Sequence, residues 1–323
     1  MRNKFTILVT SAGRRNQLLQ CFRDDASALG LPLRLLAADL KPDLSSACHQ
    51  ADMAYAVPRC TDSDYVPALM EICQRHEVSL LVPTIDTELA LLSRHVSEFA
   101  AVGTRVVVSE PTVVDLARDK IKTALRLADA GVSIPQTLQL GAYLADPSQL
   151  KGAVIAKPKG GSSSIGIIRP KSPSELEGLS QTDYLVQEMW EGIEYTVNVF
   201  FDHNGELRCA VPHRRIETRG GEVSKGRTER VPALVEAARK LATALPGARG
   251  PLCFQAIVTE AGEYAVFEIN ARFGGGYPLA HRAGAQFSKW LLEEAAGLSS
   301  SANDDWKDGV TMLRYDAAVF LNE

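Results

Sequence analysis

Short apolar runs alternate with helical patterns along the first third of the chain. Runs typical of buried strands occupy residues 5–10, 33–40, 79–84 and 105–109. Segments with apolar residues three and four apart, as in amphipathic helices, occupy residues 15–29, 64–76 and 87–99. Such alternation predicts right-handed βαβ units and a mostly parallel sheet, and therefore an α/β domain.

The rest of the chain follows a different pattern, in which strands come in pairs. A helical segment at 113–132 stops at Gly131, a residue common just after helix ends. Two hairpins are expected, with turns at Asn204-Gly205 and Ala261-Gly262. Further helices are predicted over 231–245 and 285–297, further strands over 152–158, 184–190 and 310–321, and a polar, basic stretch over 213–230. This part is therefore predicted to be α+β.

The composition is that of an ordinary globular protein. Of 323 residues, 46% are hydrophobic and 23% charged, and the net charge of −4 argues against nucleic acid or an anionic membrane as partner. No apolar run approaches the roughly 20 residues of a membrane helix, and the start lacks the pattern of a signal peptide. The six cysteines are scattered and the histidines form no paired motif, which predicts a cytoplasmic protein with reduced thiols and no zinc site.

Polar residues follow the predicted strands of the first part, at the sheet edge where parallel sheets bind ligands. They are Ser11, Gly13, Arg14 and Arg15, then Asp39, and then Thr84, Asp86 and Glu88. Asp39 stands where a ribose-binding acid could lie, but the loop "TSAGRRNQ" lacks the GxGxxG fingerprint. A nicotinamide site is therefore disfavoured.

The stretch "VFEINARFGGG" (266–276) places polar residues on one face of an apolar strand. Glu268, Asn270 and Arg272 alternate along it, and counting outward from the Ala261-Gly262 turn brings Gln255 of the paired strand near Glu268. Carboxylate and amide oxygens suit Mg²⁺. A structural salt bridge between Glu268 and Arg272 is the alternative.

Two further segments carry candidate ligand-binding groups. Lys157 ends a predicted buried strand and precedes "KGGSSSIG", whose backbone N–H groups and hydroxyls could hold a phosphate; the alternative is a flexible surface turn. Glu188, Met189 and Trp190 end the next predicted strand, and Glu194 follows. These residues could offer hydrogen bonds and apolar cover to an adenine and a carboxylate to a ribose, or be surface residues around a turn.

The ordered motifs "RDK", "AKP", "KGGSSSIG", "QEMWEGIEYTV", "FQAIV" and "FEINAR" resemble the ATP-grasp superfamily, in its branch related to the large subunit of carbamoyl phosphate synthase. "SAGRR" and "PTIDTEL" are similar to the pre-ATP-grasp domain of that branch. The resemblance implies a Rossmann-like pre-ATP-grasp domain over 1–110, a small ATP-grasp lobe with a helical linker over 111–185, and a large lobe over 186–323. It also implies binding of ATP with two Mg²⁺ ions, or Mn²⁺ in their place.

The same resemblance assigns roles to individual residues. It implies that Lys120 and Lys157 contact ATP phosphates, that Glu188, Met189 and Trp190 bind adenine, and that Glu194 binds ribose. The loop closing over the phosphates would be Gly160, Gly161, Ser162, Ser163, Ser164 and the residues up to Gly166. Glu268 would bridge two metal ions, with Gln255 on one and Asn270 on the other. Arg272 would stabilise the transferred phosphoryl group, and the glycines after it, Gly275 among them, would let substrate approach the backbone.

The activity implied is that of a carboxylate–amine ligase, which activates a small carboxylate such as an amino acid as an acyl phosphate. A kinase and a non-catalytic nucleotide-binding protein are the alternatives, and homodimers are common in the superfamily. Candidates to hold the substrate carboxylate are His213, Arg214, Arg215, Lys225 and Arg227, with Arg14 and Arg15. Asp86 and Glu88 could bind an amino group or cap the next helix. Tyr277, His281 and Arg282 are candidates to line the acceptor pocket.

Overall fold

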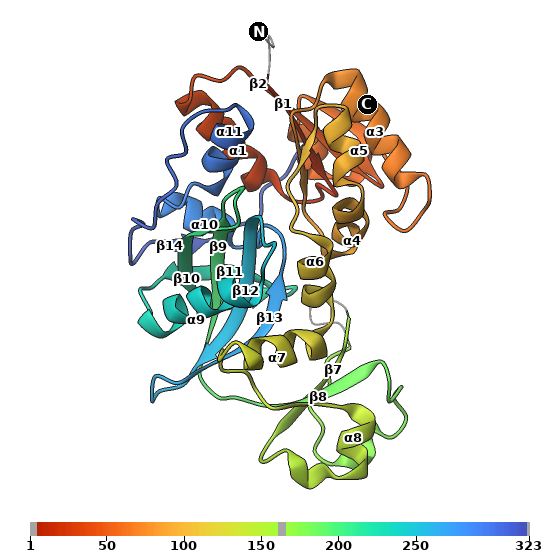
Figure 1. Ribbon diagram of the computed structural model, residues 1–323, viewed down its shortest axis with the longest axis vertical. Coiled ribbons are helices and arrows are strands. Elements are labelled where there is room, and N and C mark those ends of the chain that lie inside the picture. Colours follow the sequence, from red (N-terminus) through yellow and green to blue (C-terminus); the bar gives the residue numbers. More distant parts are fainter. Residues whose placement is uncertain (1–4, 161–165, 322–323) are drawn as a thin grey trace.

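The computed structural model describes residues 5–160 and 166–321 and contains three sheets. Figure 1 shows them along the long axis of the molecule: the N-terminal sheet lies at one end, the largest sheet in the middle and the smallest sheet at the far end. This arrangement confirms the predicted mixture of a parallel α/β domain and an α+β part, in the order expected.

The N-terminal sheet is parallel throughout, with strand order β3-β2-β1-β4-β5. Its strands are β1 (Phe5–Thr10), β2 (Leu33–Asp39), β3 (Met53–Ala56), β4 (Leu80–Pro83) and β5 (Arg105–Val106). Its helices are α1 (Asn16–Ala28), α2 (Ser46–Gln50), α3 (Tyr65–His76), α4 (Asp86–Arg94) and α5 (Val96–Ala101), with a 3-10 turn at Pro42–Leu44. The strand predicted over 105–109 is shorter than expected.

The linker predicted as one helix over 113–132 consists of two, α6 (Pro111–Arg118) and α7 (Lys120–Asp129). Asp119 between them is extended, and its carboxylate accepts hydrogen bonds from the N–H groups of Ile121 and Lys122. Asp119 is therefore the N-cap of a second helix, which ends the first one. The break puts Lys120 at the start of α7, where its N–H donates to the Lys159 carbonyl at 3.3 Å.

The smallest sheet has order β6-β8-β7 and is antiparallel, with its own small core around Leu140, Ala156 and Leu176. Its elements are β6 (Thr137–Gln139), α8 (Leu140–Ala145), β7 (Val154–Pro158) and β8 (Tyr184–Glu188), with 3-10 turns at Pro147–Gln149 and Pro173–Leu176. Because β8 runs past residue 185, we propose that the small lobe extends to Glu188 and that the domain division otherwise stands as predicted.

The largest sheet has order β13-β12-β9-β10-β11-β14. Its strands are β9 (Ile193–Phe201), β10 (Leu207–Arg219), β11 (Glu222–Thr228), β12 (Gly250–Val258), β13 (Tyr264–Asn270) and β14 (Thr311–Leu313). The helices of this part are α9 (Pro232–Ala244), α10 (Tyr277–Arg282) and α11 (Phe287–Ala295). Gly205 and Gly262 have φ of 86° and 83°, in the left-handed region that favours glycine, so both predicted hairpin turns are confirmed.

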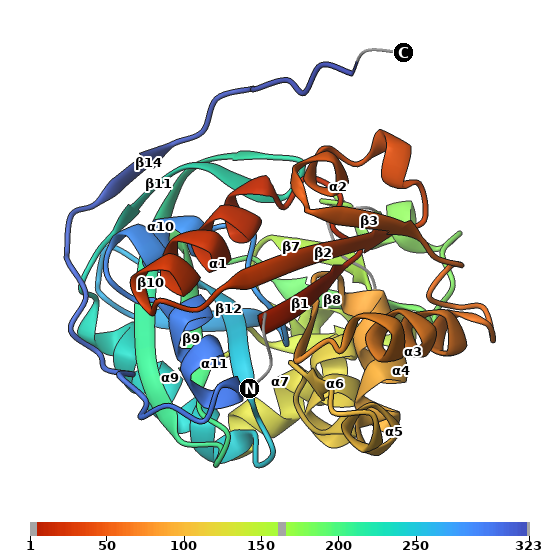
Figure 2. The ribbon, with the colours of Figure 1, turned by 90° about the horizontal axis from the view of Figure 1, so that it is seen from above.

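Two segments of this part differ from the sequence analysis. The basic stretch 213–230, for which no strand was predicted, is a hairpin of β10 and β11 that turns at Gly220-Gly221, with φ of 59° and 78°. Alternating residues such as Val223 and Thr228 are buried there, which a solvated loop would not show. The closing strand predicted over 310–321 covers Thr311–Leu313, and the chain beyond it runs away from the body of the molecule in Figure 2.

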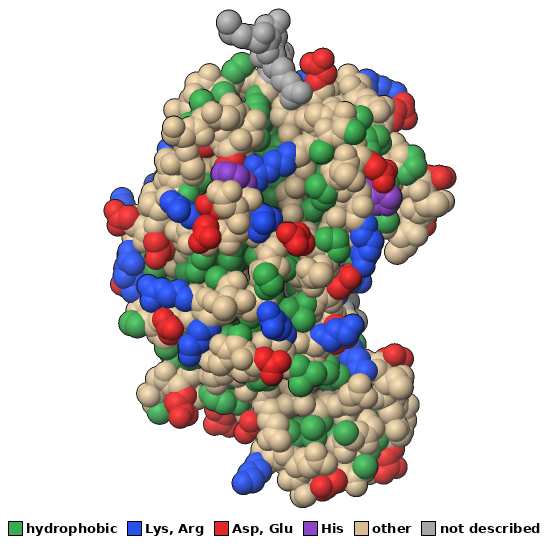
Figure 3. All heavy atoms as spheres, viewed as in Figure 1, with side chains coloured by type: hydrophobic (Ala, Val, Ile, Leu, Met, Phe, Trp, Pro, Cys, Tyr) green, Lys and Arg blue, Asp and Glu red, His purple; other side chains and the backbone are tan. Residues whose placement is uncertain are grey.

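The N-terminal domain packs on α10 and α11 through a buried polar contact. Asp25 on α1 is 1% exposed, and both its carboxylate oxygens lie 3.0 Å from Nε2 of His281. The Ser288 hydroxyl also donates to Asp25. This network fixes the N-terminal strand ends relative to the largest sheet. Figure 3 shows charges of both signs mixed over one face of the molecule, and no helix within the described ranges is long and apolar enough to cross a membrane.

Candidate active site

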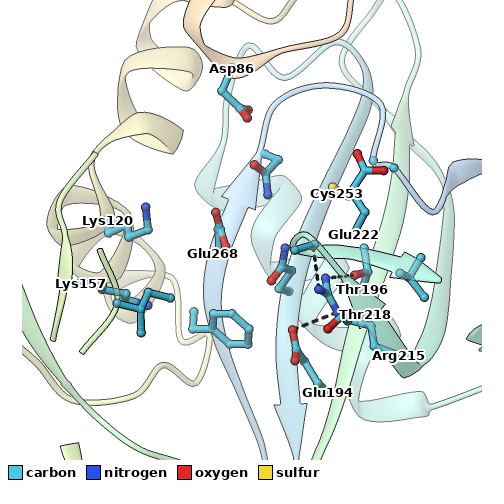
Figure 4. Close-up of a pocket in the computed structure, with 18 of the residues that line it drawn as sticks. Asp86, Lys120, Lys157, Glu194, Thr196, Arg215, Thr218, Glu222, Cys253 and Glu268 are labelled. Carbon is cyan, nitrogen blue, oxygen red and sulfur yellow. Dashed lines mark hydrogen bonds and ion pairs between the residues drawn. The ribbon is translucent and has the colours of Figure 1, made fainter. Parts of the chain in front are cut away.

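One large cleft, of about 820 Å³, lies where the linker and the smallest sheet face the largest sheet and the N-terminal strand ends. Figure 4 shows Lys120 and Lys157 on one wall, and Glu268, Cys253 and Glu194 on the strands of the other. The residues lining it include Lys120, Lys157, Gly160, Glu188, Met189, Trp190, Glu194, Arg215, Gln255, Glu268, Asn270, Arg272, Gly275 and Asp86. Sequence positions as far apart as Asp86 and Gly275 thus share one site.

The floor of the cleft is the antiparallel pair β12–β13, in which Gln255 lies directly opposite Glu268. Asn270, 6% exposed, is two residues further along β13 and on the same face. The site thus offers one carboxylate and two amide oxygens. That donor set fits Mg²⁺, which usually takes one or two protein carboxylates and completes its shell with water and substrate phosphates.

Arg272 ends this row, and its partner is Asp86 rather than Glu268. Its Nε and one terminal nitrogen lie 3.1 and 2.7 Å from Oδ2 of Asp86, and the same nitrogen lies 3.2 Å from the Asn270 side-chain oxygen. Burial disfavours the charged guanidinium, but Asp86 beside it raises the pKa of Arg272 above its ordinary value. The alternative of a structural salt bridge between Glu268 and Arg272 is therefore wrong.

Lys157 faces the floor from β7 and is 6% exposed. Its ammonium donates to the Gln187 side-chain oxygen at 2.7 Å and lies 5.3 Å from the centre of the Phe267 ring. Burial, and in addition the positive charge of Lys120, lower the pKa of Lys157 to about 8, although Glu268 opposes the shift. Two lysines, one buried and one partly buried, thus share this wall of the cleft, where an anionic ligand would relieve the repulsion between their charges.

The glycine-rich loop follows Lys157. Gly160 lines the cleft, whereas Gly161, Ser162, Ser163 and Ser164 lie outside the described residues. The predicted role of these four in holding phosphates stays a prediction.

The connection between the two lobes runs along one end of the cleft. The N–H groups of Glu188 and Met189 donate to the carbonyls of Gln136 and Ala153, both at 2.9 Å, so this segment is fixed to the small lobe. Glu188, Met189 and Trp190 all face the cleft. Glu194 begins the next strand, and its carboxylate lies 3.1 Å from Nε of Arg215.

Several residues predicted to bind substrate lie elsewhere. Arg14 is exposed to solvent, while its neighbour Arg15 lines the cleft. Lys225 is exposed and pairs with Glu217 at 2.6 Å. Tyr277 is 1% exposed and its hydroxyl lies 3.0 Å from that of Ser288, within the hydrophobic core.

Glu88 and His213 are also withdrawn from solvent. Glu88 is fully buried and accepts hydrogen bonds from the N–H groups of Thr84 and Ile85 and from the hydroxyls of Ser11 and Tyr65. Glu88 therefore caps α4, which is one of the two roles predicted for it from the sequence, the other being to bind an amino group. His213 is fully buried, and burial together with Arg215 and Arg314 lowers its pKa to about 3, so it is neutral and cannot serve as a cation.

Two of the three glycines after Arg272 lie where a side chain would collide with the β10–β11 hairpin. A Cβ on Gly275 would lie 2.6 Å from the Glu222 carboxylate, and one on Gly276 would lie 2.6 Å from Nε2 of His213. The glycines therefore let the β10–β11 hairpin pack against this turn. All three glycines also line the cleft, so their predicted role in letting substrate approach the backbone stays a prediction.

Three residues around the cleft, Gln187, Glu222 and Arg314, were missed by the sequence analysis. Gln187 fixes Lys157, and Glu222 lies between Arg15 and Arg314, at 3.1 Å from each. For Glu222 a signal was available in the Gly220-Gly221 pair, because a glycine pair between two polar runs predicts a hairpin turn, and the second strand then starts at Glu222.

Comparison with known proteins agrees with this architecture. Residues 7–107 match the PylC-like N-terminal domain family, and residues 117–276 match the ATP-grasp domain family. No curated protein matches the sequence.

Many solved structures share the fold. L-amino acid ligase from Bacillus licheniformis is 18% identical, with a TM-score of 0.68 over 93% of this chain and 76% of that one. N5-carboxyaminoimidazole synthetase from Staphylococcus aureus, solved with ADP, is 14% identical, with a TM-score of 0.70 over 97% and 94%. The biotin carboxylase domain of 2-oxoglutarate carboxylase from Hydrogenobacter thermophilus, solved as a dimer with MgADP and bicarbonate, is 16% identical, with a TM-score of 0.73 over 96% and 74%.

These likenesses establish the fold, and the two family matches take in most of the elements around the cleft. The resemblance inferred from the sequence motifs is thereby confirmed at the level of the superfamily. The chain combines a PylC-like N-terminal domain with an ATP-grasp domain.

Proposed function

We propose that this protein is an ATP-dependent ligase that activates a small carboxylate as an acyl phosphate and joins it to an amine, releasing ADP and phosphate. The observation that carries the proposal is the pairing of Gln255 with Glu268 on a floor that two lysines, Lys120 and Lys157, face across the cleft. A site with cations on one wall and magnesium ligands on the other suits a triphosphate.

ATP would lie with its adenine against Glu188, Met189 and Trp190 and its ribose near Glu194. Its phosphates would then run along the cleft between the lysines and the floor. Lys157 is already held by Gln187, so it presents its charge without reorganisation when nucleotide binds.

Magnesium would be held by Glu268, Gln255 and Asn270 together with the phosphates. When bound, it would supply neutralisation of the charge that develops on the phosphoryl oxygens. The protein's own contribution is the geometry of the strand pair, which sets these side chains on one face.

The chemistry then needs positioning more than side-chain nucleophiles. An oxygen of the substrate carboxylate attacks the γ-phosphorus, the bond from that phosphorus to the β-γ bridging oxygen breaks, and ADP leaves with the electron pair. Arg272, held rigidly by Asp86, would stabilise the phosphoryl group in transit. The amine nitrogen then attacks the acyl carbon, phosphate leaves, and the amine gives up a proton to solvent.

The proposal also includes the oligomeric state, the requirement for MgATP and the location of the protein. The biotin carboxylase domain cited above was solved as a dimer with MgADP, which supports a homodimer and a requirement for MgATP here. All six cysteines are free thiols, which supports the cytoplasm as its location.

The proposal is tested by incubating the protein with MgATP, hydroxylamine, and pools of amino acids and small carboxylic acids. Hydroxamate and ADP that appear together, with one pool, are the expected result, and both should vanish in Glu268→Ala. ADP with a phosphorylated alcohol in place of hydroxamate would show a kinase instead.

A further inference from the structure

Three segments distant in the sequence meet at the end of the cleft formed by the turn after Arg272, and Arg15 and Glu222 of this group line the cleft itself. Arg15 comes from the β1–α1 connection, Glu222 from the start of β11, and Arg314 from the residue after β14. One nitrogen of Arg15 lies 3.1 Å from one Glu222 oxygen, and one nitrogen of Arg314 lies 3.1 Å from the other. The side chains are 19%, 38% and 27% exposed, so the cluster is largely shielded from solvent.

Arg314 is tied to the site by a second contact, because it also donates to the Gly275 carbonyl in the turn after Arg272. It lies beyond residues 117–276, the part that matches the ATP-grasp family. The strand β14, which ends just before Arg314, pairs with β11, and the Arg314 N–H donates to the Ser224 carbonyl at 2.9 Å, so the position of this arginine is fixed against β11.

The charges at this end do not balance. Among the described residues there, Arg15, Arg272 and Arg314 face Asp86 and Glu222, which leaves one positive charge in excess. Arg215 is already paired with Glu194, and His213 behind the glycines is neutral. Burial lowers the pKa of Arg15, which shows that its charge is poorly solvated. A partly buried surplus charge is costly until an anion joins it.

We propose that Arg15 and Arg314, held apart by Glu222, form a binding position for a carboxylate that the reaction does not consume. This inference rests on the proposed function and names its substrate class. One substrate carries a spectator carboxylate, being either a dicarboxylic acid activated at its other end or an amino acid that supplies the amine.

The geometry favours a carboxylate over the other groups a small substrate could present. A single surplus charge matches a monoanion better than a doubly charged phosphate ester, and the guanidinium fork suits a planar carboxylate. A substrate ammonium group would need acidic oxygens, but both oxygens of Glu222 already face arginines and Asp86 is engaged by Arg272. Glu222 is thus a positioning residue for the two arginines.

Calorimetry on the protein saturated with MgADP tests this directly. The probes are pairs that differ in one group: succinate with succinamate, glutarate with glutaramate, and each of several amino acids with its amide. We expect at least one acid to bind about 10-fold more tightly than its amide. Arg314→Gln should abolish that difference, and Arg314→Lys, which keeps the charge but not the fork, should reduce it.

The matched control is Arg219→Gln. Arg219 is on the same hairpin, and one of its nitrogens lies 3.0 Å from Asp316 in the same C-terminal segment, but its side chain is 73% exposed. This variant should keep the full preference for the acid, and thermal melts of all variants should show intact folding.

Three outcomes would overturn the inference. The first is that no acid binds more tightly than its amide, the second is that neither acid nor amide binds, and the third is that Arg314→Gln weakens the binding of acid and amide equally. The last would show a structural role alone. Hydroxamate formation from a substrate with a single carboxylate, unchanged in Arg314→Gln, would support the proposed ligase; if in addition no amino acid binds more tightly than its amide, this carboxylate position is refuted while the ligase stands.

Discussion

Gln255 and Glu268 face each other as direct partners on the antiparallel strands β12 and β13, and a bulge follows Gln255 in the ladder. Adjacent residues of such a pair have Cβ atoms about 5 Å apart, near enough to hold one ion. The pairing brings an amide and a carboxylate together on the floor of a cleft whose other wall carries two lysines.

The first prediction concerns Glu268 itself. Glu268→Ala removes the carboxylate proposed to hold magnesium and should lower kcat by at least about 100-fold. Glu263→Ala, at the exposed turn of the same hairpin, is the control and should leave kcat unchanged. Steady-state ADP release measures both, and a Glu268 variant with near-normal kcat would remove this residue from the site.

The second prediction concerns the pair of Arg272 and Asp86. Asp86→Asn keeps the shape of the side chain but removes the charge that orients Arg272. Arg272 would then be less rigidly placed, and kcat should fall about 10-fold with little change in the affinity for ATP. Arg272→Lys should be more damaging, because the bidentate contact is lost. Equal kcat in Asp86→Asn and the unmodified protein would contradict the positioning role.

The third prediction follows from the depressed pKa of Lys157, about 8 in the free protein. The ammonium form binds phosphate, so affinity for MgATP should be constant below pH 7 and fall as the pH rises through 8. Nucleotide phosphates raise the pKa of Lys157, so binding near pH 8.5 should take up a proton.

Calorimetry in two buffers of different ionisation enthalpy measures that proton. In Lys157→Arg, whose guanidinium stays charged, both the proton uptake and the pH dependence should vanish. Proton release on binding would contradict the assignment.

The fourth prediction concerns Glu88, which is fully buried and receives four hydrogen bonds. Glu88→Ala leaves the N–H groups of Thr84 and Ile85 without a partner and should cost about 2–3 kcal/mol in the free energy of unfolding. Glu88→Gln retains an acceptor and should cost less. Urea denaturation measures both, with the exposed Glu98→Ala as control, and a neutral Glu88→Ala would contradict the capping role.

The fifth prediction separates the two explanations of the glycines. Gly276→Ala would place a Cβ within 2.7 Å of Val223 and 2.6 Å of the fully buried His213, so the hairpin would have to shift. We expect a loss of about 1–3 kcal/mol in stability. A Gly276→Ala protein of normal stability with a raised KM would favour the interpretation in which glycine makes room for substrate.

Local turn chemistry explains why much of this fold could be predicted from the sequence. Asn204-Gly205 and Ala261-Gly262 fix two hairpins, and counting from the second turn is enough to place Gln255 opposite Glu268. The alternation of strands and helices likewise predicts the parallel sheet of the N-terminal domain.

Side-chain directions were harder to predict from the sequence where the backbone departs from regular strand or helix geometry. Ser11 and Gly13 have φ of 50° and 47°, and this twist turns Arg15 rather than Arg14 into the cleft. Register shifts in the β10–β11 ladder around Glu217 reset the alternation, so Glu222 faces the site and Lys225 faces solvent. Neither irregularity follows from the hydrophobic pattern.

The central claim is that the chain makes an acyl phosphate, and transfer of an isotope tests it most directly. The substrate identified with hydroxylamine would be labelled with ¹⁸O in its reacting carboxylate and turned over with MgATP and its amine. The phosphate released would be examined by ³¹P NMR. The proposed chemistry predicts one ¹⁸O in each phosphate, because a carboxylate oxygen stays on phosphorus when the amine attacks. Unlabelled phosphate, formed together with ADP, would contradict it.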